Sequence, residues 1–168
     1  MPATLHDITK ENPPEYFLID TSALWHVVAQ ITPQLLTQIK KPKKLAVANR
    51  CADFQRFWNA AILSPNPSIV LLPDFVIDEY KNLYKNSKKK LAILDDFMGK
   101  IPHIPIKLEN DMLHAFWKLY SENKQMCVVD VLNVIHARKN DVNNIFSFDQ
   151  HFHLVDGLHV YTHPSIIK

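Results

Sequence analysis

Residues 16–25 of the chain read YFLIDTSALW, and this stretch decides the fold. Its first four residues are apolar or aromatic and favour a short, buried β-strand. Asp20 follows directly, and Thr21 or Ser22 then suits the cap of a helix over residues 21–30. A buried strand that continues into a helix is the start of an α/β unit. The carboxylate placed at the end of a buried strand needs an explanation.

Short apolar runs alternate with helical patterns along the rest of the sequence. Further strands are predicted over residues 69–73, 103–108, 144–149 and 158–163. Further helices are predicted over residues 32–39, 44–63, 74–86, 91–100, 109–123 and 127–140. Pro105 limits the strand over 103–108 to an edge or to a strand end. The alternation predicts an α/β fold, with a mostly parallel, five-stranded central sheet covered by helices on both faces.

The composition favours one folded domain over residues 1–168. Hydrophobic residues make up 47% of the chain and charged residues 21%, as in ordinary folded proteins. Residues 1–15 show no signal-peptide pattern, and no apolar run approaches the roughly 20 residues of a membrane span. Cys51 and Cys127 are expected at core positions in a reducing compartment. We therefore expect a cytoplasmic protein with no membrane association.

The scarcity of glycine excludes two kinds of nucleotide site. The chain has only Gly99 and Gly157, and neither lies in a predicted strand-to-helix turn. Phosphate-binding P-loops and dinucleotide fingerprints need several glycines at one such turn. Nucleotide binding of these types is therefore not expected.

Two acids follow strands at the edge where parallel α/β sheets place their functional crevice. Asp20 ends the first strand, and Asp149 follows the apolar segment 145–148. The carboxyl ends of neighbouring parallel strands meet at one edge of a sheet. Each acid alone is equally well explained as a helix cap or a turn residue. Two strands that end in this way favour a shared site.

Glu79 and Asp130 lie on helix faces that are otherwise apolar. Apolar side chains occupy most of the positions three or four residues from each acid, among them Phe75, Val76 and Leu83 around Glu79, and Asn133 is the polar neighbour of Asp130. A buried carboxylate needs a cation, hydrogen bonds or a raised pKa. A buried salt bridge is the structural alternative, but no Lys or Arg lies within the turn before Asp130. Asn133 is a candidate for a hydrogen bond to the acids.

A shared divalent cation would satisfy all four acids. At an effective dielectric constant of about 20, two carboxylates ~5 Å apart repel by roughly 3 kcal/mol. Oxygen-only ligands select Mg²⁺ or Mn²⁺ over zinc. Such ions at strand ends suit phosphodiester hydrolysis, because they stabilise charge on the phosphate.

These motifs, in this order, resemble the PIN-domain ribonucleases, above all the VapC-type toxins of toxin–antitoxin pairs. The likeness covers about residues 16–162 and includes VVDVLNVIHA (128–137) and SFDQHF (147–152). It implies a PIN-like three-layer α/β/α sandwich and a Mg²⁺- or Mn²⁺-dependent endonuclease that cuts single-stranded RNA. The family's acidic quartet falls on four residues, and its assisting hydroxyl on a fifth: Asp20, Glu79, Asp130, Asp149 and Ser22.

Two features depart from the family's pattern. Ser147 stands where family members commonly have Thr, two positions before the fourth acid. A lysine-bearing, helical insertion spans about residues 31–50. The net charge is only +2, but the lysines are grouped, and we treat these as candidate RNA contacts: Lys40, Lys41, Lys43, Lys44, Lys88, Lys89 and Lys90. Solvated loop charge is the alternative interpretation of both runs.

The resemblance leaves the cellular role open. The candidate partners are an RNA substrate, an antitoxin protein and a second copy of the chain. The alternatives are a PIN nuclease of RNA processing or decay and a non-catalytic PIN-like module that binds RNA or protein.

Aromatic and histidine residues add weaker signals. Trp25, Trp58 and Trp117 follow helical patterns and are expected mostly in the core, with base stacking as the alternative. His151 and His153 form a His-x-His pair, predicted on an extended segment and not expected to bind metal.

Overall fold

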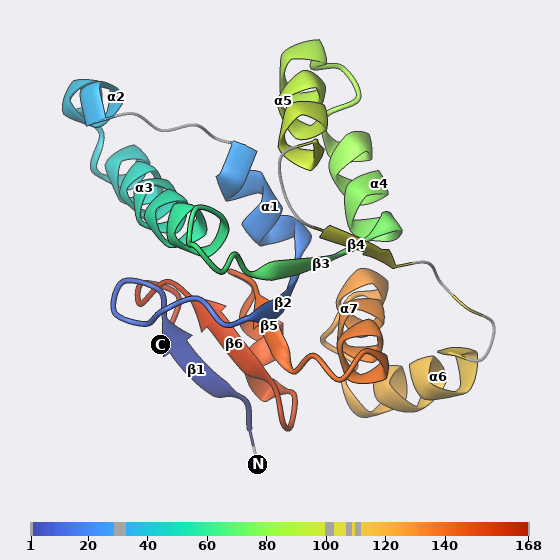
Figure 1. The fold of residues 1–168 in the computed structure, drawn as a ribbon. Helices are drawn as coiled ribbons and strands as arrows, with labels where there is room; N and C mark the ends of the chain where they lie inside the picture. Colours follow the sequence, from blue (N-terminus) through green and yellow to red (C-terminus); the bar gives the residue numbers. More distant parts are fainter. Residues whose placement is uncertain (1, 29–32, 100–102, 107–108, 110–111, 168) are drawn as a thin grey trace.

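A parallel sheet of six strands forms the centre of the fold in a computed structural model, which describes residues 2–28, 33–99, 103–106, 109 and 112–167 (Figure 1). The strands are β1 (Thr4–Asp7), β2 (Tyr16–Ile19), β3 (Ile69–Pro73), β4 (His103–Ile106), β5 (Asn144–Phe146) and β6 (His159–Thr162). Their order across the sheet is β1-β6-β5-β2-β3-β4, and all five pairings are parallel.

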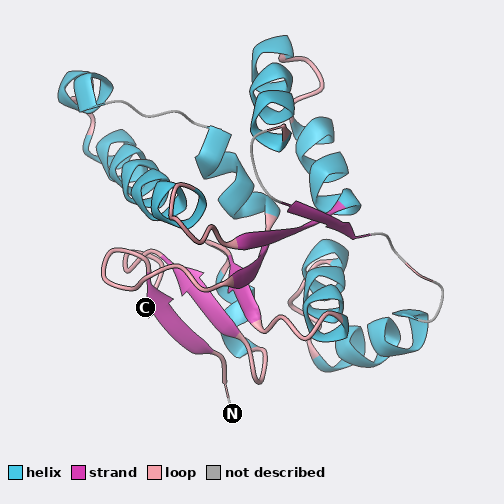
Figure 2. Cartoon of the chain, in the orientation of Figure 1, coloured by secondary structure: helices cyan, strands magenta, loops and turns pink. Residues whose placement is uncertain are grey.

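Helices cover both faces of this sheet and make three layers (Figure 2). They are α1 (Thr21–Val28), α2 (Pro33–Gln38), α3 (Pro42–Ile62), α4 (Asp74–Leu83), α5 (Lys88–Met98), α6 (Met112–Glu122) and α7 (Val128–Lys139). Side chains of α1, α3, α4 and α5 join one hydrophobic core, and those of α6 and α7 join the other. The predicted α/β/α architecture is confirmed.

The central strand β2 supplies both cores. Phe17 and Ile19 enter the core beneath α1 and α3, and Leu18 enters the core beneath α7. None of the three side chains is exposed. Successive side chains of a strand point to opposite faces, so a strand buried on both faces must be apolar throughout. This is why the run YFLI favoured a strand.

The predicted number of strands was wrong, because β1 was not expected. Its residues Thr4–Asp7 are mostly polar and half-exposed, and the strand lies at the sheet edge, where it pairs only with β6. An edge strand of this kind has no apolar run to reveal it. The ring of His6 in β1 stacks on Tyr161 of β6, with centroids 4.6 Å apart. Tertiary contacts therefore hold a segment that has little strand signal of its own.

Other expectations hold within the described residues. β4 is the opposite edge strand, as Pro105 required. Five predicted elements fall partly outside the described residues: 21–30, 32–39, 91–100, 103–108 and 109–123. The parts that the structure does not describe are residues 29–30, 32, 100, 107–108 and 110–111. Across the described part of the chain, no helix has the length and apolarity that a bilayer span demands.

Candidate active site

The two neighbouring strands β2 and β5 lead into the candidate site. From β2 the chain continues to β3 and β4 on one side of the sheet, and it later returns to β5 and β6 on the other side (Figure 1). Ligands of open α/β sheets bind at such a reversal of strand order, outside the carboxyl ends of the strands. Asp20 follows β2, and Ser147 and Asp149 follow β5. These side chains therefore meet at one edge.

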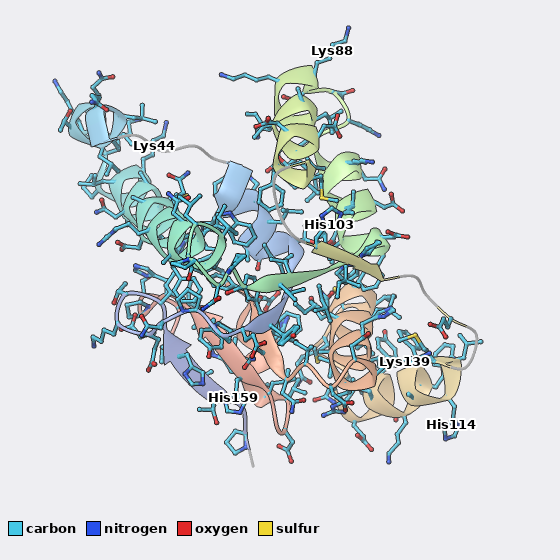
Figure 3. All side chains as sticks on the ribbon, in the orientation of Figure 1. Lys44, Lys88, His103, His114, Lys139 and His159 are labelled. Carbon is cyan, nitrogen blue, oxygen red and sulfur yellow. The ribbon has the colours of Figure 1, made fainter. Side chains whose placement is uncertain are left out.

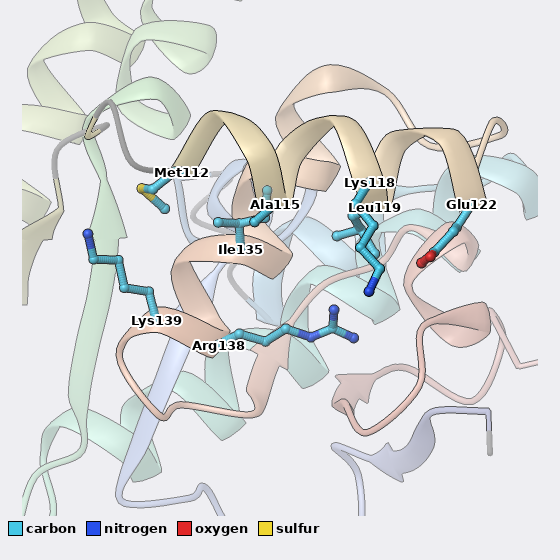
Figure 4. Close-up of a pocket in the computed structure, with 8 residues that line it drawn as sticks. All are labelled: Met112, Ala115, Lys118, Leu119, Glu122, Ile135, Arg138 and Lys139. Carbon is cyan, nitrogen blue, oxygen red and sulfur yellow. The ribbon is translucent and has the colours of Figure 1, made fainter.

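All four predicted acids line one open cavity of about 490 Å³ at this edge. Its wall includes Asp20, Glu79, Asp130 and Asp149, together with Thr21, Ser22, Trp25, His26, Val47, Arg50, Leu83 and Cys127. A second cavity, between α6 and α7, is lined by Met112, Arg138 and Lys139 among others and by none of the four acids (Figure 4). The carboxylates are thus gathered in the first cavity, from four separate segments of the chain.

Asp20 is buried within a network of hydrogen bonds. Its side chain, in a residue only 3% exposed, accepts bonds at Oδ2 from Ser22 Oγ at 2.6 Å and from Ser147 Oγ at 2.9 Å. The amide of Asn133 donates to Oδ1 at 3.0 Å. These donors fix the carboxylate in one orientation and partly replace the water that burial removes.

Asp20 also caps helix α1, which corrects the prediction that Thr21 or Ser22 is the cap. Its Oδ2 accepts the backbone N–H of Ser22 at 3.2 Å, and its carbonyl accepts those of Ala23 and Leu24. Asp149 likewise caps a short 3-10 helix, η1 (Gln150–Leu154), through the N–H of His151 at 2.9 Å. For both acids the helix-cap interpretation is confirmed, and it is compatible with their place in one cavity. Helix N-termini favour a carboxylate.

Asp130 lies in the first turn of α7 and forms a capping box with Cys127. The Cys127 N–H donates to Asp130 Oδ2 at 3.1 Å, and the Asp130 N–H donates to Cys127 Sγ at 3.4 Å. Cys127 is exposed and lines the acidic cavity, so its expected core position was wrong, whereas Cys51 is buried. Partial burial of the sulfur raises the pKa of the Cys127 thiol to about 11, which keeps it protonated, although the residue as a whole is exposed.

Glu79 is half-buried on α4, and Thr21 positions it. The hydroxyl of Thr21 donates a short hydrogen bond to Glu79 Oε2. The neighbouring Asp78 is exposed. The pairing of Thr21 with Glu79, 58 positions apart in the sequence, was not predicted, because it depends on α1 packing beside α4.

His151 stands against two of the acids. Its Nδ1 lies 3.0 Å from Asp149 Oδ1 and 3.9 Å from Asp130 Oδ2. One ligand atom from each of these three residues fits within a span of 4.8 Å. The prediction that the His-x-His pair lies on an extended segment was wrong, because the pair lies on the 3-10 helix η1. This turn brings His151 to the acids, although nothing in the sequence distinguishes it from His153.

The electrostatics of the cluster favour a cation. Burial, together with the smaller effect of the Asp130 charge, raises the pKa of Asp20 to about 6. Burial also raises the pKa of Asp130, and the charge of Asp149 adds to that effect. Within the described residues no Lys or Arg forms an ion pair with any of the four acids. Uncompensated carboxylates and an imidazole form a donor set that fits a divalent metal ion.

The predicted RNA-contacting lysines lie on separate parts of the surface. Lys44 stands near the start of α3 and Lys88 at the start of α5, at the outer ends of two different helices (Figure 3). Lys43 and Lys44 line a cavity that adjoins the acid-lined cavity, whereas Lys90 lies over the ring of Tyr84. Lys40 and Lys41 precede α3, and both are exposed.

Tryptophan positions were predicted only in part. Trp58 is buried as expected, and Trp25 is half-buried at the edge of the acidic cavity. Trp117 on α6 is 63% exposed, so its expected core position was wrong. It is Phe116 and Leu119 of this helix that enter the core in its place.

Comparisons with known proteins show which fold this is. No protein-family model matches the sequence, and no curated protein matches it by sequence comparison. Among solved structures, VapC20 of Mycobacterium tuberculosis, a toxin that cleaves the sarcin–ricin loop, superposes with a TM-score of 0.56 and 15% identity over 81% of this chain and 92% of its own.

A second similar structure is VapBC2 of Rickettsia felis, bound to a DNA fragment from its promoter. It superposes with a TM-score of 0.56 and 13% identity, and the match covers 86% of this chain and 96% of that chain. At such low identity the likeness concerns the fold. The resemblance to PIN-domain toxins seen in the sequence motifs is therefore borne out in three dimensions: this chain has the fold of the VapC toxins.

Proposed function

We propose that this chain is a Mg²⁺- or Mn²⁺-dependent endoribonuclease that hydrolyses phosphodiester bonds of single-stranded RNA. One observation carries the proposal: four acids from distant segments line one cavity at the carboxyl ends of the central strands. The fold supports it, because VapC20, a toxin that cleaves the sarcin–ricin loop, has the same fold. Helix capping by Asp20, Asp130 and Asp149 does not by itself require four carboxylates in one cavity, where like charges repel.

Asp20, Glu79, Asp130 and Asp149 are the proposed metal ligands and catalytic residues. A bound divalent cation supplies Lewis-acid stabilisation of the charge that develops on the phosphate. The chain's own contribution is orientation, since Ser22, Ser147 and Asn133 hold Asp20, and Thr21 holds Glu79. Ser22 and Asn133 are therefore proposed as assisting residues.

We further propose that the protein acts in the cytoplasm as a toxin with an antitoxin partner. VapBC2, which shares the fold, is a complex bound to its own promoter DNA. A small DNA-binding protein encoded directly upstream would support the toxin role over RNA processing or decay. A homodimer is also proposed, and its test is the molar mass in solution.

Cleavage of a labelled single-stranded RNA in the presence of Mn²⁺ tests the proposal. Asp20→Asn and Glu79→Gln should each lower the rate at least about a hundredfold, as loss of a preorganised electrostatic group does. Asp78→Asn, an exposed neighbour of Glu79, is the matched control and should leave the rate unchanged. Chelation of divalent ions should abolish cleavage.

Wild-type rates from Asp20→Asn would refute the nuclease. In that case, a melting temperature that does not respond to Mn²⁺ would favour the non-catalytic binding module instead.

A further inference from the structure

A third cavity, distinct from the one between α6 and α7, adjoins the acid-lined cavity along α3. It has a volume of about 380 Å³ and shares Trp25 and Val47 with the acid-lined cavity. Buried Ala48 and Cys51 contribute to its apolar wall. The two cavities therefore lie side by side along α3, and we call them together the α3 groove, acidic at one end and apolar at the other.

Cations follow this groove along one face of α3. Lys43, Val47 and Arg50 are spaced four and three residues apart, which places them on the same side of the helix. Lys43 and Lys44 are exposed beside the apolar cavity, and Arg50 lines the acidic one. Lys43 and Arg50 are separated by about 10 Å along the helix. A short stretch of nucleotides bridges that distance.

Arg50 is held in place without a counter-ion. Its Nε donates to His26 Nε2 at 3.3 Å, and His26 Nδ1 lies 2.7 Å from the carbonyl oxygen of Ser22. A carbonyl only accepts, so His26 carries its proton on Nδ1 and offers Nε2 to Arg50. The guanidinium carbon lies 6.0 Å from the centre of the Phe148 ring. Among the residues that the structure describes, no carboxylate pairs with Arg50.

Such an arginine has the chemistry of a phosphate-binding group. Its fork-shaped donors match phosphate oxygens, and its Nε is already occupied, which orients the two terminal amino groups. A polyanion that approaches four carboxylates also needs positive charge close by. The half-buried Trp25 adds an aromatic ring between the two cavities, on which a base can stack.

We propose that the α3 groove is a nucleotide subsite for single-stranded RNA. Arg50 binds a phosphate beside the one that is cleaved, a base stacks on Trp25, and Lys43 and Lys44 bind the phosphates that follow. The inference rests on the proposed ribonuclease function and extends it, because it gives the first turns of α3, which fall within the predicted insertion over about residues 31–50, a role in substrate binding. A protein segment that fills the groove is the competing occupant, and the test below separates the two.

Binding of a fluorescently labelled single-stranded RNA decamer, measured by anisotropy in EDTA to prevent cleavage, tests the subsite. The double variant Lys43→Ala/Lys44→Ala should bind more weakly and lower the salt slope by about 1.4, which is roughly 0.7 for each phosphate that the protein no longer neutralises. The matched control is Lys118→Ala/Lys124→Ala, which removes the same charge at two exposed positions that line neither cavity of the α3 groove. It should bind RNA as the wild type does.

Base stacking is tested by pairing a protein variant with a modified RNA. An abasic site scanned along the decamer should weaken binding to the wild type at one position by about five- to a hundredfold. Trp25→Leu, which keeps an apolar side chain, should remove that penalty. If Trp25→Leu proves unstable, the subsite is still tested by the abasic scan on the wild type and by the Lys43→Ala/Lys44→Ala variant.

Equal losses in the two lysine variants, or an abasic scan with no sensitive position, would overturn the subsite. Wild-type RNA cleavage combined with unchanged binding by Lys43→Ala/Lys44→Ala would refute the subsite alone and leave the nuclease intact. A wild type that neither cleaves nor binds RNA would refute both proposals.

Discussion

Asn133 Nδ2 donates a hydrogen bond of 3.0 Å to Asp20 Oδ1, and it joins α7 to the end of β2 across 113 positions of sequence. Asn133 is fully buried and Asp20 is 3% exposed. In the described part of the chain, Asn133 Oδ1 has no hydrogen-bond partner. The side chain of Asn133 is therefore oriented by its hydrogen bond to the Asp20 carboxylate, and this orientation leaves its Oδ1 without a partner among the described residues.

Replacement of this amide by an acid should destabilise the protein. Asn133→Asp puts a second carboxylate against Asp20, which adds repulsion on the order of 3 kcal/mol at an effective dielectric constant of about 20. Urea denaturation at pH 7 without divalent ions measures the change. Asn49→Asp, at an exposed position of α3, is the matched control and should change the free energy of unfolding by less than about 0.5 kcal/mol. Equal effects of the two variants would contradict the role given to Asn133.

Asp20→Asn should stabilise the metal-free protein at neutral pH. The pKa of Asp20 is about 6 in the folded state against 3.8 in the reference state, because burial disfavours the charged form. A raised pKa makes a stabilising contribution that is complete below pH 3.8 and is lost as the pH rises through 6. The variant should therefore gain about 3 kcal/mol at about pH 7.5 and nothing near about pH 4.

Thermal or urea unfolding across this pH range checks the prediction. An asparagine that keeps its oxygen at the Oδ2 position still accepts the bonds from Ser22 and Ser147, and a rotated Asn133 amide can accept from its nitrogen. A variant less stable than the wild type at neutral pH would contradict the unfavourable burial of Asp20.

His26 should produce the opposite dependence on pH. Burial lowers its pKa to about 4 from 6.5, so the unfolded chain takes up a proton first as the pH falls. Its stabilising contribution is complete above pH 6.5 and is lost as the pH falls towards 4, by about 3 kcal/mol in all. His26→Gln should therefore lose stability less steeply than the wild type on acidification. Parallel pH profiles of variant and wild type would refute this assignment.

Asp20 and His26 should thus compensate each other in the wild type between about pH 4 and pH 6. The Asp20→Asn variant, with only the His26 effect left, should lose stability on acidification more steeply than the wild type over this interval.

Mn²⁺ should stabilise the protein, and His151 should contribute to the preference for this ion. A ligand that binds only the folded state adds about 2.7 kcal/mol at a hundredfold excess over its dissociation constant. Imidazole suits transition metals better than Mg²⁺. His151→Gln should therefore reduce the shift in melting temperature caused by Mn²⁺ and leave that caused by Mg²⁺ almost unchanged.

His114→Gln, at an exposed position on α6, is the matched control for this variant. Equal Mn²⁺ responses of the wild type and His151→Gln would show that His151 does not reach the ion.

The sequence by itself determined the class of fold and singled out the four acids that line one cavity. Strands buried on both faces must be apolar, so YFLI and IVLLP are recognisable as strands, and the helical patterns between them require parallel connections. A carboxylate after such a strand, or on an apolar helix face, is visible because burial of charge is costly. Local rules of this kind can be read from neighbouring residues alone.

Only the tertiary structure decided which segments meet. It placed β5 beside β2, added the polar edge strand β1, and turned His151 towards Asp149 through a 3-10 helix. It also joined Asn133 to Asp20 and Arg50 to His26. Contacts between residues far apart in sequence depend on how whole elements pack, and no pattern within either segment encodes its partner.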